Sequence, residues 1–302
     1  MKKQLTEFSW IWAVPGKTLA ALSVAAVSSL FSVNTGWADN VYNYIGFGIQ
    51  DHTLYGFTDY ETRVVLSNSI LTANAHGNHL ATDALNNRLL YTKGLGDGNI
   101  TALYAWDFDL GGEVLLYSGL NVVGYSSGGA SFWNGSYYLY DDEPSGSPSA
   151  VGIVKITFNP DGSVDTISKP FGNINPAGGL GDVAIDPSGI MYILSTNGEL
   201  RSIDLTIETT TPTFTLIGDT GLNGGGQLFF DPVGNLLVRS GTNWVIVDPL
   251  TAEPVGTING GASATYADLS SAALNPIPEP GSVLLFSMGA CLVLFMRRRA
   301  HY

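Results

Sequence analysis

Two neighbouring histidines are the first residues whose spacing is suited to metal chemistry. The segment His76-Gly77-Asn78-His79 holds the one close pair among the chain's four histidines. A helical zinc site places its histidines four residues apart with a glutamate between them, and this segment has neither the spacing nor the glutamate. Because the segment is rich in Gly and Asn, we expect an exposed loop and assign no metal ligand here.

Four aspartates recur along the chain at comparable positions, and they are the second candidate for chemistry. If they met near one axis, their carboxylates could act as general acids and bases or could bind calcium. Each of them, however, stands at the end of an apolar run and just before a turn, where an Asp side chain accepts backbone N–H groups. We expect turn caps and no cofactor, with calcium as the weaker alternative. The four residues are Asp51, Asp83, Asp186 and Asp231.

The remaining polar and glycine-rich segments point to no catalytic apparatus. Asp141-Asp142-Glu143 precedes a Ser/Pro-rich stretch, which predicts a solvated insertion, with a weak calcium or partner contact as the alternative. The glycines of 94–98 are not followed by a helix or a Lys-Ser/Thr pair, so a phosphate loop is not indicated. The only cysteine, Cys291, lies in a terminal apolar run, outside the body of the chain. We assign no catalytic residue and do not expect an enzyme.

The composition favours an all-β fold with an acidic surface. Hydrophobic residues make up 45% of the chain and charged residues only 13%, with 37 glycines. Residues 39–275 keep seven basic and 24 acidic side chains, a formal charge of −17. Such a surface repels phosphate backbones, so we expect no nucleic-acid partner.

A repeat runs through the body of the chain. A short apolar run, a turn and a second run that carries an aromatic recur five times, at 45–47 and 54–56, 81–83 and 89–91, 130–132 and 138–140, 183–186 and 191–193, and 228–231 and 236–238, with Leu237 in place of the aromatic in the last. At the second run the spacings are 36, 49, 52 and 45 residues, measured at Tyr55, Tyr91, Tyr140, Tyr192 and Leu237. Two of the turns, Asp186-Pro187-Ser188-Gly189 and Asp231-Pro232-Val233-Gly234, have proline where φ is preset and glycine where φ is positive, which is typical of hairpins.

The repeat predicts a β-propeller. A third strand follows the hairpin at residues 200–205 and 244–248, and a fourth follows at 213–217. Four short strands in about 45 residues form one blade. We therefore expect five four-stranded blades, with six as the alternative count and a jelly-roll or sandwich as the alternative fold. Small residues should lie near the crowded axis, as in Gly178-Gly179, Gly224-Gly225-Gly226 and Gly260-Gly261.

One apolar segment at the end of the body has no hairpin of its own. An open ring would expose the edges of its first and last blades, which is costly in an all-β domain. We expect Tyr266-Ala267-Asp268-Leu269-Ser270 to pair with strands in the 41–66 region and so close the ring.

The N-terminal 38 residues are typical of a secretory signal. Lys2, Lys3 and Lys17 precede an apolar run over 19–33, and the small residues Gly36 and Ala38 stand three and one positions before the expected cut. We expect a signal helix over 1–38, export by the Sec machinery and cleavage after Ala38. An amphipathic helix that stays on the mature protein is the alternative.

The C-terminal segment 276–302 has three parts in order. Pro278-Glu279-Pro280 is followed by a predominantly apolar run of 14 residues over 283–296 and then by Arg297-Arg298-Arg299. As a helix the apolar run is about 21 Å long, against a hydrocarbon core of roughly 30 Å, so it predicts a short transmembrane helix that is later removed. The arginines favour a cytoplasmic tail end, which leaves the body on the far side of the membrane.

This three-part pattern resembles the sorting domain of PEP-CTERM proteins. The resemblance covers about 25 of the 302 residues. It implies a processing enzyme of the exosortase type in a Gram-negative bacterium that makes exopolysaccharide, with cleavage near Pro278-Glu279-Pro280. It also implies transient membrane anchoring, followed by delivery to the envelope surface or the extracellular matrix.

Two functions of different classes follow from these observations. The first is a non-catalytic propeller scaffold at 39–275 that binds exopolysaccharide or surface proteins. The second is a propeller enzyme of the cell envelope, such as a lactonase, lyase or glycan hydrolase, with or without calcium. An enzyme should place several carboxylates or histidines in one axial pocket, whereas a binding protein should not.

Overall fold

The structure, a computed structural model, describes the body of the chain with several gaps. The described residues are 40–50, 52–70, 75–95, 99–123, 129–141, 152–172, 174, 180–209, 212–222, 226–240, 242–258, 266 and 268–271. They all belong to the second of the two units into which the chain divides, which begins at Asp39. Among these residues no helix is long and apolar enough to span a membrane. The expected signal helix, the cleavage point at Ala38 and the whole sorting tail lie outside them.

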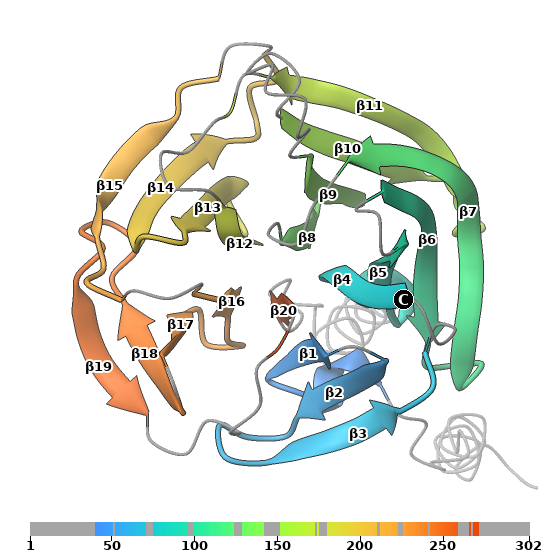
Figure 1. Cartoon of the computed structure of the whole chain (residues 1–302), viewed down its shortest axis with the longest axis horizontal. Helices are drawn as coiled ribbons and strands as arrows, with labels where there is room; N and C mark the ends of the chain where they lie inside the picture. The colour runs from blue at the N-terminus through green and yellow to red at the C-terminus, as the bar shows by residue number, and fades with distance from the viewer. Residues whose placement is uncertain are drawn as a thin grey trace, which may run out of the picture. The chain divides into compact units, whose positions relative to one another are not determined.

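The described body is a ring of five four-stranded antiparallel sheets, as the repeat predicts (Figure 1). We number the blades one to five in chain order. Blade one consists of β20, β1, β2 and β3, from the axis outward, and blades two to five are β4–β7, β8–β11, β12–β15 and β16–β19.

The strand bounds of the first three blades are as follows. Blade one has β20 (Asp268–Ser271), β1 (Gly46–Gln50), β2 (Thr53–Phe57) and β3 (Arg63–Ser67). Blade two has β4 (Ala75–Asp83), β5 (Arg88–Leu95), β6 (Asn99–Asp107) and β7 (Gly112–Val123). Blade three has β8 (Ala130–Trp133), β9 (Ser136–Asp141), β10 (Gly152–Phe158) and β11 (Val164–Gly172).

The other two blades have the following bounds. Blade four has β12 (Leu180–Ile185), β13 (Ile190–Ser195), β14 (Glu199–Asp204) and β15 (Thr215–Asp219). Blade five has β16 (Leu228–Phe230), β17 (Leu236–Ser240), β18 (Asn243–Val247) and β19 (Pro254–Ile258). Two short 3-10 helices complete the described elements, η1 (Val41–Asn43) before β1 and η2 (Ala84–Asn86) between β4 and β5.

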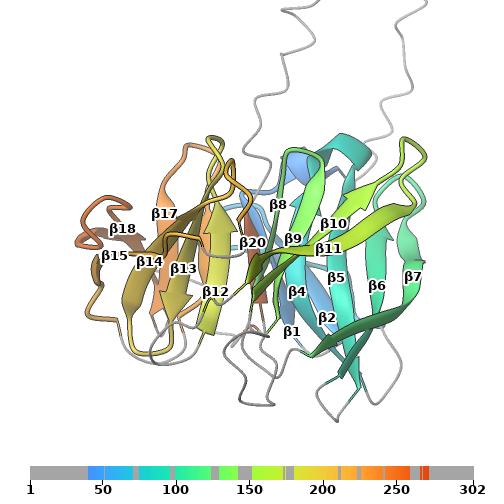
Figure 2. The same ribbon diagram turned by 90° about the horizontal axis from the view of Figure 1, so that it is seen from above.

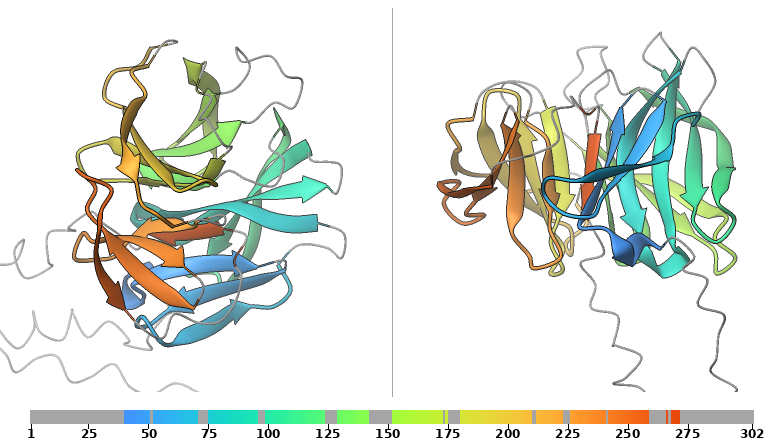
Figure 3. Two further views of the ribbon diagram at one scale, coloured as in Figure 1. Left: turned by 60° about the vertical axis from the view of Figure 1, so that its left-hand side comes forward. Right: turned by 90° about the horizontal axis from the view of Figure 1, so that it is seen from below.

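The ring closes by the pairing that the sequence predicts. Strand β20 is antiparallel to β1, with Phe47 opposite Ser270 and Gly48 opposite Leu269. In Figure 3 this orange-red strand lies beside the blue strands from the other end of the body. The innermost strand of blade one therefore comes from the C-terminal end of the body, and the other three come from its N-terminal end.

This closure corrects one detail of the repeat. The first predicted hairpin, at residues 45–47 and 54–56, forms the second and third strands of its blade, whereas the other four hairpins form the first and second. Tyr55 on β2 is thus not equivalent to Tyr91 on β5, and the matching strand in blade one is β1. The apolar alternation is the same in both cases, so the pattern alone does not reveal the offset.

The core lies in the five seams between neighbouring blades, which stand side by side in Figure 2. Alternate residues of one strand serve opposite seams, because strand side chains alternate between faces. On β5, Leu89 and Tyr91 are buried against blade one, and Leu90 between them is buried against blade three. A blade thus buries both faces only when it has neighbours on both sides.

The two predicted Asp-Pro turns form as expected. Gly189 and Gly234 have φ values of +91° and +89°, the region that glycine enters without a steric penalty. In each turn the glycine N–H bonds to the carbonyl of the aspartate that opens it. Local sequence therefore fixes both hairpins.

The histidine segment is not the exposed loop that its composition predicts. Residues 76–79 belong to β4, the inner strand of blade two, and His79 is fully buried. His79 has a φ of +56°, where the register of β4 against β5 shifts between Asn78 and Ala81. The Gly and Asn residues of this segment therefore belong to a local irregularity in a strand and not to a loop.

Candidate functional site

Two aspartates on inner strands meet at the centre of the ring. Asp182 is on β12 of blade four and Asp268 is on β20 of blade one, and both side chains are fully buried. The two carboxyl groups hydrogen-bond to each other. Because two ionised carboxylates repel, such a contact requires a proton on at least one of them.

Backbone N–H groups from strands of four blades donate hydrogen bonds to these carboxyl oxygens. Asp182 accepts from Leu228 of blade five at 2.8 Å and from its own neighbour Val183 at 2.6 Å. Asp268 accepts from Leu80 of blade two and from Leu269 at 2.9 Å. The pair thereby ties blades one, two, four and five together at the axis.

Burial raises the pKa of both carboxyl groups. For Asp182 desolvation raises the pKa to about 7, and the hydrogen bonds from Asp268, Leu228 and Val183 oppose this effect. For Asp268 desolvation raises the pKa well above its usual value, and the charge of Asp182 raises it further. In the folded ring the pair therefore holds a proton that free aspartates would release.

Blade three contributes a glycine to the same contact. An added Cβ at Gly129, just before β8, would lie 1.7 Å from the Asp182 Oδ1 atom and 2.6 Å from the Val183 nitrogen. Only glycine fits at this distance. The inner end of blade three therefore packs directly on the carboxyl pair.

Further hydrogen bonds between inner strands surround the pair. Thr82 and Ser270 join their hydroxyl groups at 2.8 Å, and the Phe230 N–H donates to the Ser271 hydroxyl at 2.9 Å. The Tyr137 hydroxyl of blade three donates to the His79 carbonyl. These contacts connect blade one to two, five to one and three to two.

His79 is neutral in this setting. Its Nδ1 atom lies 2.8 Å from the Thr92 hydroxyl, and burial lowers its pKa to about 4. Among the residues that the structure describes, no group of three or more His, Cys, Asp or Glu side chains has the geometry to hold a metal ion.

The described members of the four predicted aspartates are turn caps. Asp186 Oδ1 accepts from the N–H groups of Ser188 and Ile190, and Asp231 Oδ1 accepts from those of Val233 and Asn235. Asp231 also accepts a 2.6 Å bond from the Tyr60 hydroxyl across the seam between blades five and one. Asp51 lies outside the described residues.

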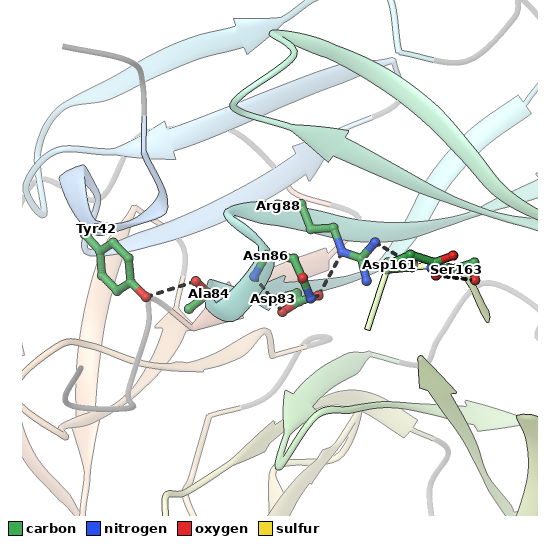
Figure 4. A network of polar contacts seen from close by, with 8 residues as sticks. Tyr42, Asp83, Ala84, Asn86, Arg88, Asp161 and Ser163 are labelled. Atoms are coloured by element: carbon green, nitrogen blue, oxygen red, sulfur yellow. Dashed lines mark hydrogen bonds and ion pairs between the residues drawn. The ribbon is translucent and has the colours of Figure 1, made fainter. Parts of the chain in front are cut away.

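Asp83 caps η2 and also belongs to a buried network at the seam of blades two and three (Figure 4). Its Oδ2 atom accepts from Arg88 Nε at 2.8 Å, and Arg88 Nη1 donates to the Gly162 carbonyl at 2.8 Å. The guanidinium group lies 4.7 Å from the centre of the Phe158 ring. This arrangement is an ion pair that joins blades, and its partners are all internal to the fold.

The repeat pattern of the sequence did not indicate the axial pair. Asp182 and Asp268 both stand near the start of an inner strand and are followed by an apolar residue. That shared position was the available signal. The described members of the recurring set, Asp83, Asp186 and Asp231, stand at the opposite, turn end of their strands.

One serine segment fits the motif of a hydrolase nucleophile. Gly124-Tyr125-Ser126-Ser127-Gly128 fits Gly-x-Ser-x-Gly, and the sequence analysis gave it no role. A nucleophile elbow requires a strand, a sharp turn and then a helix. Here the segment, which lies outside the described residues, joins strand β7 to strand β8. This context does not match a hydrolase elbow.

The predicted sorting residues Pro278, Glu279, Pro280 and Arg297 to Arg299 are not described. Of the acidic segment 141–143, only Asp141 is described, as the last residue of β9. Of the glycines at 94–98, Gly94 lies in β5, and the next described element after it is strand β6, not a helix.

Comparison with known proteins gives structural likenesses only. No protein-family model matches the chain, and no curated protein matches it. A gluconolactonase from Xanthomonas campestris has a TM-score of 0.47 at 17% identity, over 75% of this chain and 80% of that chain. A chain in a nidogen–laminin complex has 0.46 at 11% identity, over 76% and 84%. Regucalcin, a calcium-binding protein from Agrobacterium tumefaciens, has 0.43 at 14% identity, over 76% and 78%. At these identities no activity is carried over to this chain.

Proposed function

We propose that this chain is an exported scaffold of the bacterial envelope, whose five-bladed body binds exopolysaccharide or surface proteins without catalysis. The signal segment 1–38 directs export, and the tail 276–302 holds the body at the membrane until an exosortase-type enzyme removes it. The support for export and sorting is the order of sequence features at the two ends.

One observation supports the scaffold role of the body. Among the described residues, the carboxyl groups that converge on the axis are those of Asp182 and Asp268, which accept backbone N–H groups from several blades and share one hydrogen bond with each other. A general acid or a calcium ligand needs oxygen atoms that face its substrate or ion. The meeting of these two carboxyl groups at the axis is thus better explained by a role in joining the blades than by a role in catalysis.

The experiment on sorting compares two adjacent triple replacements in the full-length chain. Each variant is expressed in a Gram-negative host that has an exosortase-type enzyme, and the intact mass of the exported protein is measured. Alanines at Pro278-Glu279-Pro280 should leave the tail attached. Alanines at the neighbouring Asn275-Pro276-Ile277 should leave processing unchanged. Equal C-termini in the first variant and the wild type would refute the sorting proposal.

The same mass measurement reports the N-terminus, which we expect at Asp39. Retention of the processed protein on the host's purified exopolysaccharide then tests the binding role. Calcium-dependent opening of a sugar lactone by the processed protein would favour the enzyme alternative.

A further inference from the structure

Three exposed apolar side chains lie at one end of the seam between blades one and two. Tyr42 of η1 is 41% exposed, Leu85 of η2 is 68% exposed, and Leu110 in the β6–β7 turn is 72% exposed. Large apolar side chains that are exposed together are typical of an interaction surface. These three residues are referred to below as the apolar patch.

Hydrogen bonds hold the elements of the apolar patch together. The Tyr42 hydroxyl donates to the Ala84 carbonyl of η2 at 3.0 Å, which holds the ring beside that helix (Figure 4). The Asn87 side chain, directly after η2, accepts the Val41 N–H at 3.1 Å and donates to the Asp109 carboxylate at 2.7 Å. The patch is therefore preformed, which lowers the entropic cost of binding a ligand.

The described body ends beside this patch. Ser271, the last residue of β20, is opposite Gly46 at the start of β1. The Ser270 hydroxyl lies 2.8 Å from the Thr82 hydroxyl. Leu85 is three residues beyond Thr82, at most about 11 Å along the chain. The segment that follows Ser271 therefore leaves the ring within reach of the apolar patch.

That segment has the composition of a ligand for such a surface. Residues 272–278 contain two prolines, a leucine and an isoleucine and no charged group. Each proline favours an extended or polyproline II conformation at the residue before it. In polyproline II three residues make one turn, which would put Leu274 and Ile277 on the same side. Segments of this kind bind to surfaces that present an aromatic ring, as Tyr42 does here.

The charge of the body favours this occupant over others. Residues 39–275 have seven basic and 24 acidic side chains, so an anionic polymer, an anionic membrane or a second copy of the body would be repelled. Residues 272–278 bring no such repulsion, because they carry no charge. They are also joined covalently to the body, which gives them a high effective concentration at the patch.

We propose that the apolar patch binds residues 272–278 and so holds the Pro278-Glu279-Pro280 motif against the folded body. Leu274 packs against Leu85, and the prolines lie against the Tyr42 ring. The inference rests on the proposed sorting role of the tail. It adds that the propeller itself presents the motif to the processing enzyme.

Disulfide trapping in the full-length chain tests this contact. Cys291→Ser removes the only natural cysteine, and the chain is purified in detergent from a host without a processing enzyme, so that the tail remains attached. Leu274→Cys is combined with either Leu85→Cys or Val233→Cys, and disulfide formation is followed after addition of a mild oxidant. We expect the pair with Leu85→Cys to form on the order of tenfold faster, because a bound segment keeps its two sulfur atoms within reach.

Val233 is the matched control because it lies equally close to the end of the body. The Phe230 N–H donates to the Ser271 hydroxyl at 2.9 Å, and Val233 is three residues beyond Phe230, in the turn between β16 and β17. Its side chain is 81% exposed. A segment that does not bind the patch would react equally at both positions. Equal rates, or a faster reaction at Val233, would overturn the proposal.

Amide hydrogen exchange tests the same contact without new cysteines. The double replacement Leu274→Asp and Ile277→Asp puts two charges into the segment and changes no strand of the ring, since β20 ends at Ser271. We expect faster exchange than in the wild type in peptides that contain Tyr42 and Leu85, and equal exchange in blade four. Equal exchange in all peptides would contradict the contact. Neither measurement depends on removal of the tail, so its failure is distinct from failure of the sorting proposal.

Discussion

The carboxyl groups of Asp182 and Asp268 hydrogen-bond to each other across the axis, between strands β12 and β20. Asp268 also accepts the N–H of Leu80, which is 188 residues away in the sequence. One protonated pair thus joins the final strand of the ring to blades that are distant in the chain.

The stability of the body should fall as pH rises through neutrality. The pKa of Asp182 is raised from 3.8 to about 7 in the folded state, and that of Asp268 is raised well above 3.8. Between the unfolded and folded values the folded state holds the extra proton, so this stabilisation is complete below about pH 4 and is lost as pH rises through about 7. The slope is at most about 1.4 kcal/mol per pH unit for each proton.

Urea titrations at pH 5, 7 and 9 measure this slope. Asp182→Asn should lower stability at pH 5 and flatten the decline toward pH 9, since one titrating group is gone. Asp204→Asn is the control, because Asp204 is exposed on β14 and, among the described residues, its carboxylate accepts hydrogen bonds only from Thr206. A decline in Asp182→Asn as steep as in the wild type would contradict the assignment.

The burial of His79 should make the stability of the body fall as pH decreases below 6.5, which is the opposite of the effect of the axial pair. Burial lowers its pKa from 6.5 to about 4, so the folded state keeps it neutral while the unfolded chain binds a proton. Its contribution is present above pH 6.5 and is lost as pH falls toward 4. His79→Asn, which suits the positive φ, should show a smaller loss of stability between pH 6.5 and 4 than the wild type. Identical acid slopes in thermal melts would disprove this.

Removal of strand β20 should destabilise the whole ring and not one blade. Strand β20 covers β1 and supplies Asp268, Ser270 and Ser271 to neighbouring inner strands. A chain that ends after Ile258 should melt in one cooperative transition at a lower temperature than a chain that ends after Ser271. Calorimetry that finds the two melting temperatures equal would show that this closure contributes no stability.

The buried ion pair of Arg88 and Asp83 should contribute far more to the free energy of unfolding than an exposed ion pair does. Arg88→Met leaves the Asp83 carboxylate buried without its cation, and breaking such a pair costs about 3–5 kcal/mol. Lys155→Met removes a partly exposed pair with Glu208 and should cost at most about 1 kcal/mol. Chemical denaturation of both variants checks the contrast. Similar losses in the two would mean that the Arg88 network at the blade seam is not tightly coupled.

The sequence by itself determined the all-β class, the blade period and the direction of ring closure. These features have local or pairwise causes. The Asp186 and Asp231 turns carry their own proline, glycine and capping carboxylate, and the segment at 266–270 was the one strand without a hairpin partner. The expectation of turn caps held for the described aspartates for the same reason.

The tertiary structure alone decided which residues meet at the axis and at the seams. His79 looked like part of a loop because composition does not reveal that an irregular strand is buried between blades. The sequence did not reveal that the first predicted hairpin forms the second and third strands of its blade, because the alternation of side chains between the two faces is the same in every strand of a blade. Asp182 meets Asp268, and Arg63 approaches Arg239, because the closed ring places β12 near β20 and blade five against blade one. Contacts of that kind depend on the curvature and closure of all five sheets, which short-range sequence patterns do not encode.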